Sequence, residues 1–407
     1  MLKKIPACEL QVGMYIHDLD CGWAEHPFLR SRFMVGSECE IDKIHRAGIH
    51  GVVIDCNRGL DASNAPTLTE AKESTEAGIT ALAARTFNCR RVTLAEEVER
   101  ATGVRRRATE LVRTVMADAR LGRAVELDQV GPVVESVTES VLRNPDALLG
   151  LLRIKNKDNY TFLHSVSVCA LLVAFCRSRE MDDEIIYQAG LGGLLHDIGK
   201  ALVPDAILNK QGRLSEEEFE IIKHHPRDGY DILVKTIGIG EIPLDITLHH
   251  HERHDGSGYP ERQSGRAIGE LAQMAAIVDV YDAITSDRCY HKGMPAAEAL
   301  RKIYEWSKFH FSPTLAQEFI RCIGIYPVGT LVLLESGRLG VVIEQHRKSL
   351  LTPKVNVFFN TRKQVHIRRE VVDLSRSVGA GGADRIVRIE TGDTWNIDPR
   401  HYLDTRR

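Results

Sequence analysis

The chain has 407 residues, more than one ordinary domain holds, so its length predicts two or three compact units. Hydrophobic residues make up 43% of the sequence and charged residues 27%, a composition typical of soluble globular proteins. The 53 basic and 56 acidic side chains leave a formal net charge of −3. The charge therefore gives no reason to expect binding to a DNA or RNA polymer, or to a membrane.

Targeting signals and cysteine usage both favour the cytoplasm. The first residues are not followed by the apolar run of a signal peptide, and the longest apolar stretch, Val166 to Cys176, is too short to span a bilayer. The nine cysteines form no CxxC pair, so we expect reduced, mostly buried thiols.

The first sixty residues show a β-rich pattern. Strands are predicted from Leu10 to Asp18 and from Gly51 to Asp55, and a short helix from Glu38 to Ala47 is expected to end at Gly48. A polar stretch from Asn57 to Glu73 then predicts a linker.

The pattern turns helical from Ser74 to Asn144 and forms a connector. This segment contains Arg105, Arg106, Arg107 and Arg113, which could in principle form a nucleic-acid patch. Glutamates alternate with these arginines, so a solvated helix face is the better interpretation.

The rest of the chain divides at Pro327. Residues 146 to 326 are helical in pattern, whereas Thr330 to Leu334 and Leu339 to Ile343 predict a β-hairpin, followed by strands at Val355 to Phe359 and Gln364 to Ile367. The predicted fold is multidomain and mainly α, with these parts: a small β-rich N-terminal domain (1–60), a linker and helical connector (61–145), an all-helical catalytic domain (146–326) and a β-rich C-terminal extension (327–407).

The strongest chemical signal is His196-Asp197, which follows an apolar helix. An imidazole and a carboxylate together suit a first-row transition metal. Lys200 comes three residues after Asp197, so a continuing helical turn would place its ammonium on the same face. A cation beside a metal suits a phosphate substrate.

Other candidate ligands surround this pair in the sequence. His164 begins an apolar helix and could equally be a half-buried core residue, while His225 and the run His249 to His251 could be fortuitous polar clusters. Asp279 lies in an otherwise apolar helix, where a buried carboxylate needs a partner that a metal would supply.

A loop, Asp255-Gly256-Ser257-Gly258-Tyr259-Pro260, follows the histidine run. Its two glycines permit close backbone approach and positive φ angles. Tyr259 can offer its ring to a base and its hydroxyl to a phosphate.

Together these motifs resemble the HD-GYP domain, a subgroup of the HD phosphohydrolase superfamily. The resemblance is carried by His164, HDIGK at 196–200, HHPRDG at 224–229, HHERHDGSGYP at 250–260, Asp279 and TSDRCY at 285–290. The first sixty residues also resemble an uncharacterised domain that often precedes HD-GYP domains, through Val12–Tyr15 and His26–Phe28.

The resemblance implies a phosphodiesterase that hydrolyses cyclic di-GMP to linear pGpG, and in some members on to GMP, by attack of a metal-bridging hydroxide on phosphorus. It implies one metal on His164, His196, Asp197 and Asp279. A second metal would lie on His225, His250 and His251, with Asp197 bridging the two. It also implies a catalytic Lys200 and, as further substrate contacts, Gly256, Gly258, Tyr259, Pro260, Arg288 and His291.

Three positions depart from the family pattern. Tyr160 occupies the place of a glutamate that helps to hold a third metal in some members, and Asp158 is not in helical register to replace it. We therefore expect two metals, Fe or Mn, per chain. His291 replaces a usual Arg or Lys, which would make the phosphate contact weaker or pH-sensitive, and His254 replaces an aromatic residue.

Two alternatives remain open at this level. The chain could bind cyclic di-GMP or a partner protein without cutting, or it could cut another cyclic dinucleotide. The presence of all seven expected ligands favours the enzyme. The connector or the N-terminal domain could also pair two copies as a homodimer.

Overall fold

The computed structural model describes residues 1–19, 32–47, 49, 51–62, 65–70, 92–152, 160–210, 212–286, 293–346, 349–376, 384–390 and 392–403. The chain forms two compact units, one of Met1–Ile79 with Asn209–Glu220 and one of Thr80–Leu208 with Ile221–Arg407. None of the helices in the described residues combines the length and the apolar character needed to cross a bilayer.

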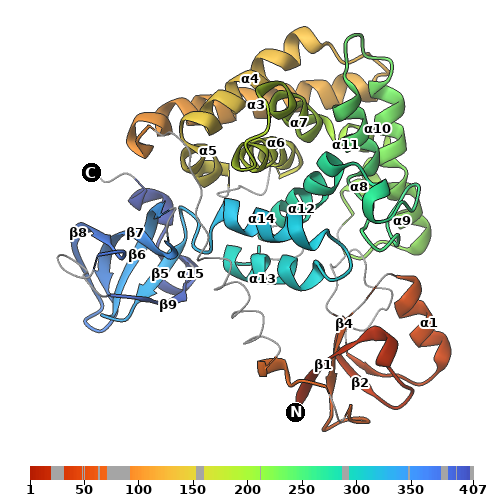
Figure 1. Cartoon of the computed structure of the whole chain (residues 1–407), viewed down its shortest axis with the longest axis horizontal. Coiled ribbons are helices and arrows are strands. Elements are labelled where there is room, and N and C mark those ends of the chain that lie inside the picture. The colour runs from red at the N-terminus through yellow and green to blue at the C-terminus, as the bar shows by residue number, and fades with distance from the viewer. Residues whose placement is uncertain are drawn as a thin grey trace. The chain divides into compact units, whose positions relative to one another are not determined.

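The N-terminal domain contains an antiparallel sheet in the order β1-β4-β2-β3 and the helix α1 (Figure 1). Its elements are β1 (Leu2–Pro6), β2 (Tyr15–Asp18), β3 (Phe33–Met34), α1 (Glu38–Arg46) and β4 (Gly51–Asp55). The predicted helix and the strand from Gly51 are confirmed. The strand predicted from Leu10 is wrong at its start, because a 3-10 helix (Ala7–Glu9) and a turn at residues 12–13 precede Tyr15.

Strand β1 was not predicted, because its Leu-Lys-Lys-Ile-Pro sequence does not alternate like a half-buried strand. The structure buries Lys3 and pairs its ammonium with Asp61 at 2.8 Å and with the Ala62 carbonyl at 2.8 Å. Thr67 forms a β-bridge to Lys3. Much of the predicted linker therefore packs within this domain.

The helical domain follows, and its elements are coloured orange to cyan in Figure 1. They are α3 (Leu94–Arg120), α4 (Leu127–Arg143), α5 (Pro145–Leu152), α6 (Tyr160–Ser178), α7 (Asp183–Leu195), η4 (Ile198–Leu202), α8 (Asp205–Leu208), α9 (Glu216–Lys223), α10 (His225–Leu233), α11 (Glu241–His249), η5 (Gly265–Ala267), α12 (Glu270–Thr285), α13 (Ala296–Trp306) and α14 (Pro313–Ile323).

Helix α3 is fastened to α4 by a buried carboxylate. Glu97 accepts hydrogen bonds from Ser140 Oγ at 2.9 Å and from Arg143 Nε at 2.8 Å. On α3, Arg106, Arg107 and Arg113 are exposed, as the solvated-face interpretation predicts, whereas Arg105 is half-buried and donates from Nη1 to the Leu151 carbonyl at 2.9 Å.

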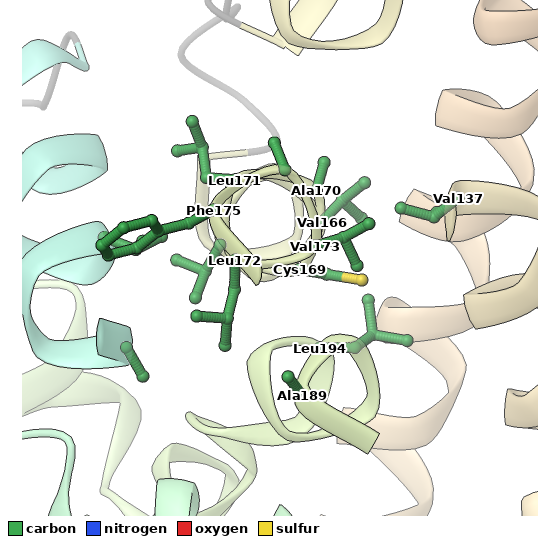
Figure 2. Close-up of a cluster of buried hydrophobic side chains, with 14 of the residues drawn as sticks. Val137, Val166, Cys169, Ala170, Leu171, Leu172, Val173, Phe175, Ala189 and Leu194 are labelled. Atoms are coloured by element: carbon green, nitrogen blue, oxygen red, sulfur yellow. The ribbon is translucent and has the colours of Figure 1, made fainter. Parts of the chain in front are cut away.

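Helix α6 is the centre of the domain. It packs against α3, α4, α5, α7, α12 and α14, so its sequence is apolar nearly all round. Figure 2 looks along this helix and shows Val166 and Val173 on the side of Val137 of α4, with Cys169 facing α7. Phe175 points the other way and meets Phe319 of α14 edge to face, with ring centroids 5.4 Å apart. This packing fixes the helix that carries His164.

The C-terminal extension is an antiparallel sheet in the order β8-β7-β6-β5-β9. Its elements are β5 (Leu331–Leu334), β6 (Arg338–His346), β7 (Ser349–Asn360), β8 (Val365–Asp373), β9 (Ile386–Ile389), α15 (Gly392–Trp395) and η6 (Pro399–Tyr402). The predicted hairpin is confirmed, with Leu331 opposite Val341. The fold class, a helical domain between two β-rich parts, is therefore as the sequence indicated.

Leu172 tests the importance of this central helix, because it is fully buried on α6. We expect Leu172→Ala to lower the free energy of unfolding by about 3 kcal/mol, since it leaves a cavity that the packed neighbours cannot fill. Urea unfolding followed by circular dichroism of the helices measures this loss. Leu121→Ala, at a side chain that is 68% exposed, should change stability by less than about 0.5 kcal/mol, and an equal loss in both variants would contradict the prediction.

Candidate metal centre

All seven predicted ligands converge in the helical domain. His164 comes from α6, His196 and Asp197 from the end of α7, His225 from the start of α10, His250 and His251 from the end of α11, and Asp279 from α12. Three overlapping groups bring their ligand atoms within 4.8 Å of one another: His164 with His196 and Asp279, His196 with Asp197 and His250, and His225 with His250 and His251.

The two carboxylate oxygens of Asp197 face different sets of imidazoles. Oδ2 lies 3.4 Å from His196 Nε2 and 3.7 Å from His164 Nε2. Oδ1 lies 3.3 Å from His225 Nε2 and 3.8 Å from His250 Nε2. Asp279 lies beside the first set, with Oδ1 2.9 Å from His164 Nε2, and its Oδ2 is 3.9 Å from His251 Nδ1. One carboxylate therefore stands between two groups of ligand atoms.

Backbone carbonyls orient three of these imidazoles. His196 Nδ1 donates to the Gly193 carbonyl at 2.9 Å, His225 Nδ1 to Ile222 at 2.7 Å and His250 Nδ1 to Thr247 at 3.0 Å. A carbonyl can only accept, so the proton must lie on Nδ1 and the lone pair on Nε2 points inward.

Two of the inward atoms have no hydrogen-bond partner within the described residues. They are His196 Nε2 and Asp197 Oδ1, and both residues are almost completely buried. Buried polar atoms without a partner are costly, and a metal ion would satisfy both. The donor set of imidazole nitrogens and carboxylate oxygens also suits a divalent transition metal, so the residues fit such an ion.

The pKa shifts of four candidate ligands, His196, Asp197, His250 and His251, favour the protonation state that binds metal. Burial and the neighbouring histidines lower the pKa of His250 to about 3. Burial also lowers the pKa of His196 and His251. The pKa of Asp197 is well below its usual range, because His196 and Lys200 outweigh the opposing effect of burial. At neutral pH these three imidazoles are therefore neutral and the carboxylate is ionised.

Comparison with known proteins agrees with this geometry. Residues 146–315 match the family model described as HD domain, and residues 2–130 match a domain of unknown function, DUF3391. The chain is 45% identical over 398 residues to the "Cyclic di-GMP phosphodiesterase PA4108" of Pseudomonas aeruginosa, covering 98% of this chain and 94% of that protein.

The chain belongs to this HD-domain phosphodiesterase family. Members of the family are metal-dependent phosphohydrolases.

Two further relatives match over shorter lengths. The "Cyclic di-GMP phosphodiesterase response regulator RpfG" of Xanthomonas campestris is 35% identical over 49% of this chain and 53% of its own length. The "3'3'-cGAMP-specific phosphodiesterase 1" of Vibrio cholerae is 36% identical over 35% of this chain and 33% of its own length.

A tight backbone contact brings the ligand-bearing segments of the HD domain together. A Cβ on Gly199 would lie 2.0 Å from the His225 carbonyl oxygen and 2.5 Å from the Gly229 nitrogen. Only glycine therefore lets η4 approach α10 closely enough for Asp197 and His225 to meet. This contact explains the Gly in the HDIGK motif.

Lys200 lies beside the shared carboxylate. Its ammonium is 2.7 Å from Asp197 Oδ2, and the side chain is half-buried. The expectation that it shares the face of Asp197 is confirmed, although the turn is a 3-10 helix rather than a continued α-helix.

The glycine-rich loop has the two properties predicted for it. Gly256 has a φ of +81°, and a Cβ on Gly258 would lie 2.4 Å from the Arg253 nitrogen. Tyr259 is half-buried and its ring lies 4.8 Å, centroid to centroid, from the ring of His251. Pro260, also half-buried, follows directly. The loop thus brings Tyr259 to the edge of the ligand cluster.

Several predicted positions cannot be compared with the structure. Arg288 and His291 lie outside the described residues, as does Asp158. The backbone at Tyr160 begins α6, but its side chain is not described.

Two residues near the ligand cluster, His249 and Asp282, had no predicted role. His249 precedes the two candidate ligands and donates through Nδ1 to Asp245 at 2.7 Å, away from the cluster.

Asp282 is buried and accepts a hydrogen bond from His164 Nδ1 at 2.7 Å, while Asp279 meets the other nitrogen. Burial opposes the charge on His164, yet the bonds to Asp279 and Asp282 raise its pKa overall. The sequence feature that could have indicated Asp282 is its spacing of three residues from Asp279 on one apolar helix, which places both carboxylates on the same face.

Asp282 provides a test of the centre that does not rely on catalysis. We expect Asp282→Ala to weaken binding of Mn²⁺ by about 10- to 100-fold, because His164 loses the acceptor that fixes its orientation. Asp282→Asn should lose less, since its amide oxygen can accept the same hydrogen bond. Isothermal titration calorimetry with Mn²⁺ on the metal-free proteins measures the affinity of both variants.

Asp231→Asn, at an exposed residue of α10, is the matched control and should bind Mn²⁺ as the unsubstituted chain does. Equal affinity in the Asp282→Ala variant and the control would show that Asp282 does not support the metal centre.

Proposed function

We propose that this chain is a phosphodiesterase that hydrolyses cyclic di-GMP to linear pGpG, using two divalent transition metals. The observation that carries the proposal is the Asp197 carboxylate, whose two oxygens face two separate groups of imidazoles. This arrangement suits a pair of metals sharing one ligand, as in many enzymes that cleave phosphate esters. The name of the Pseudomonas relative, which aligns with nearly the whole chain, supports cyclic di-GMP as the substrate.

The distances between ligand atoms support the two ligand sets that the resemblance implies. One metal would be held by His164, His196 and Asp279 with Asp197, and the other by His225, His250 and His251 with Asp197. When bound, the two metals would supply a water of lowered pKa and stabilise the negative charge that develops at phosphorus. The mixture of nitrogen and oxygen ligands favours Fe or Mn.

Side chains around the cluster would handle the nucleotide. Lys200 would donate to a phosphate oxygen, since its ammonium lies next to the shared carboxylate and is partly open to solvent. Tyr259, Gly256, Gly258 and Pro260 would line the approach for the bases. Arg288 and His291 remain proposed contacts from the sequence.

The proposal places the reaction in the cytoplasm. The cysteines among the described residues are free thiols, as expected in a reducing compartment: Cys8, Cys39, Cys56, Cys169, Cys176 and Cys322. Of these six, only Cys169 and Cys176 are buried, so the expectation of mostly buried thiols is wrong for the described residues. Burial raises the pKa of Cys169 and Cys176 to about 12, so both are unreactive core residues. A homodimer through the connector or the N-terminal domain is part of the same proposal and would be tested by sedimentation.

The principal experiment compares the unsubstituted chain with Asp197→Ala, both purified without oxygen. We expect two metals per unsubstituted chain and conversion of cyclic di-GMP to pGpG in the presence of Mn²⁺ or Fe²⁺. Asp197→Ala should lose metal and at least about 10³-fold in activity, because both ligand groups lose their shared carboxylate. Metal analysis and chromatography of the products give the two readouts.

The substrate is tested in the same assay with 3'3'-cGAMP, the cyclic dinucleotide named for the Vibrio relative. A higher kcat/KM for cyclic di-GMP supports the proposal. A higher kcat/KM for 3'3'-cGAMP would show that 3'3'-cGAMP is the preferred substrate instead. Tight binding of either nucleotide by a metal-loaded chain that produces no linear product would favour a receptor instead.

Lys200 separates phosphate chemistry from metal binding. We expect Lys200→Ala to keep both metals but to lower kcat by about 10²-fold, because a cation that stabilises the transition state is removed. Metal analysis and steady-state kinetics decide the point. A variant with unchanged kcat would exclude a catalytic role for Lys200.

A further inference from the structure

A further buried carboxylate, Glu252, lies beside the metal centre and belongs to neither ligand set. It follows His251 in the segment after α11, which ends at His249, and only 3% of its surface is exposed. Its Oε1 accepts a hydrogen bond of 2.6 Å from the backbone N–H of Glu261. Burying a carboxylate costs free energy unless it is hydrogen-bonded, so the bond between Glu252 and the Glu261 N–H is expected to hold the two residues together.

The hydrogen bond closes the loop that contains Asp255 to Pro260. Inside the closed loop the backbone of Gly258 presses against Glu252, since a Cβ on Gly258 would lie 2.5 Å from Glu252 Cα. The Tyr259 N–H donates to the His251 carbonyl at 3.2 Å, and the two rings are 4.8 Å apart. The position of Tyr259 against a candidate metal ligand therefore depends on how this loop is closed.

The side chain of Glu261 extends the closure to a second helix. Its Oε1 accepts from Arg227 Nη2 at 2.6 Å, and its Oε2 accepts from Gln263 Nε2 at 3.0 Å. Arg227 lies on α10, two residues after His225. Both partners of the Arg227–Glu261 pair are substantially exposed, at 42% and 38%. Such pairs contribute little, so the buried bond of Glu252 is the stronger of the two restraints.

We propose that Glu252 is a positioning residue, which holds Tyr259 at the edge of the metal centre and thereby sets the affinity for a nucleotide substrate. It acts through the loop and does not touch the reacting atoms. The substrate part of this inference rests on the proposed function, whereas the restraint on the loop does not.

The kinetic test uses two substrates with the full chain. For Glu252→Ala we expect the KM for cyclic di-GMP to rise about tenfold, because the loop loses its order before binding. Turnover of bis(p-nitrophenyl) phosphate, a small diester without bases, should stay within about twofold, and the metal content should not change. Glu252→Gln should keep a KM close to that of the unsubstituted chain, since its amide oxygen can accept the same N–H. Glu241→Ala, at an exposed glutamate that begins α11, is the matched control.

A double substitution distinguishes positioning from a general loss of stability. Tyr259→Ala should raise the KM for cyclic di-GMP as Glu252→Ala does, and the double variant should be no worse than Tyr259→Ala alone. Additive effects would overturn the proposal, because they would mean that Glu252 acts by another route. Loss of metal, or of bis(p-nitrophenyl) phosphate turnover, in Glu252→Ala would also overturn it by showing that Glu252 supports the centre itself.

Hydrogen exchange tests the loop without any substrate. The amides of residues 255–259 and of Glu261 should exchange faster in Glu252→Ala than in Glu252→Gln or Glu241→Ala, and unchanged exchange would overturn the restraint. If the unsubstituted chain cleaves bis(p-nitrophenyl) phosphate but not cyclic di-GMP, the proposed function fails. The exchange experiment still decides in that case whether Glu252 holds the loop.

Discussion

The buried carboxylate of Asp197 is the interaction on which the arrangement of the helical domain depends. A charged group in such a position must be compensated, and the compensation comes from all sides at once: Lys200 at 2.7 Å and imidazoles facing each oxygen. Those imidazoles come from segments far apart in the sequence. The helices α6, α7, α10 and α11 must therefore be held at fixed separations for the carboxylate to be tolerated at all.

The helical core provides that fixed frame because glycines stand where the segments that carry the ligands meet. Gly199 allows η4 to touch the backbone of α10, and a Cβ at Gly193 would lie 3.0 Å from Cys169 Cα of α6. The apolar side chains of α6 then pack on all sides of the helix (Figure 2). A close-packed interior of this kind transmits displacement, so a change in the core would move His164 relative to Asp197.

The sequence could indicate most of the candidate ligands because they lie in short local patterns, and the structure brings these residues together. His196-Asp197, the histidine run and the glycine-rich loop are recognisable without knowledge of the fold. Asp282 was missed because its role depends on a contact with His164, 118 residues away, and its spacing from Asp279 does not by itself indicate that contact. Glu252 was missed for a similar reason, since its partner is a backbone N–H. Strand β1 was missed because the structure buries Lys3 through a tertiary ion pair with Asp61, against the usual preference of lysine.

The buried metal centre and the loop that carries Tyr259 have different roles in the site. The imidazoles and carboxylates of the centre are buried, and the pKa values of His250 and Asp197 are shifted so that at neutral pH the imidazole is neutral and the carboxylate is ionised. Metal binding then needs no proton release from these groups, and it satisfies atoms such as His196 Nε2 that otherwise cost stability. Binding of metal is therefore coupled to the stability of the helical domain. The loop with Tyr259 is attached to this rigid centre by a few hydrogen bonds, so its sequence can change the choice of nucleotide while the ligand geometry stays the same.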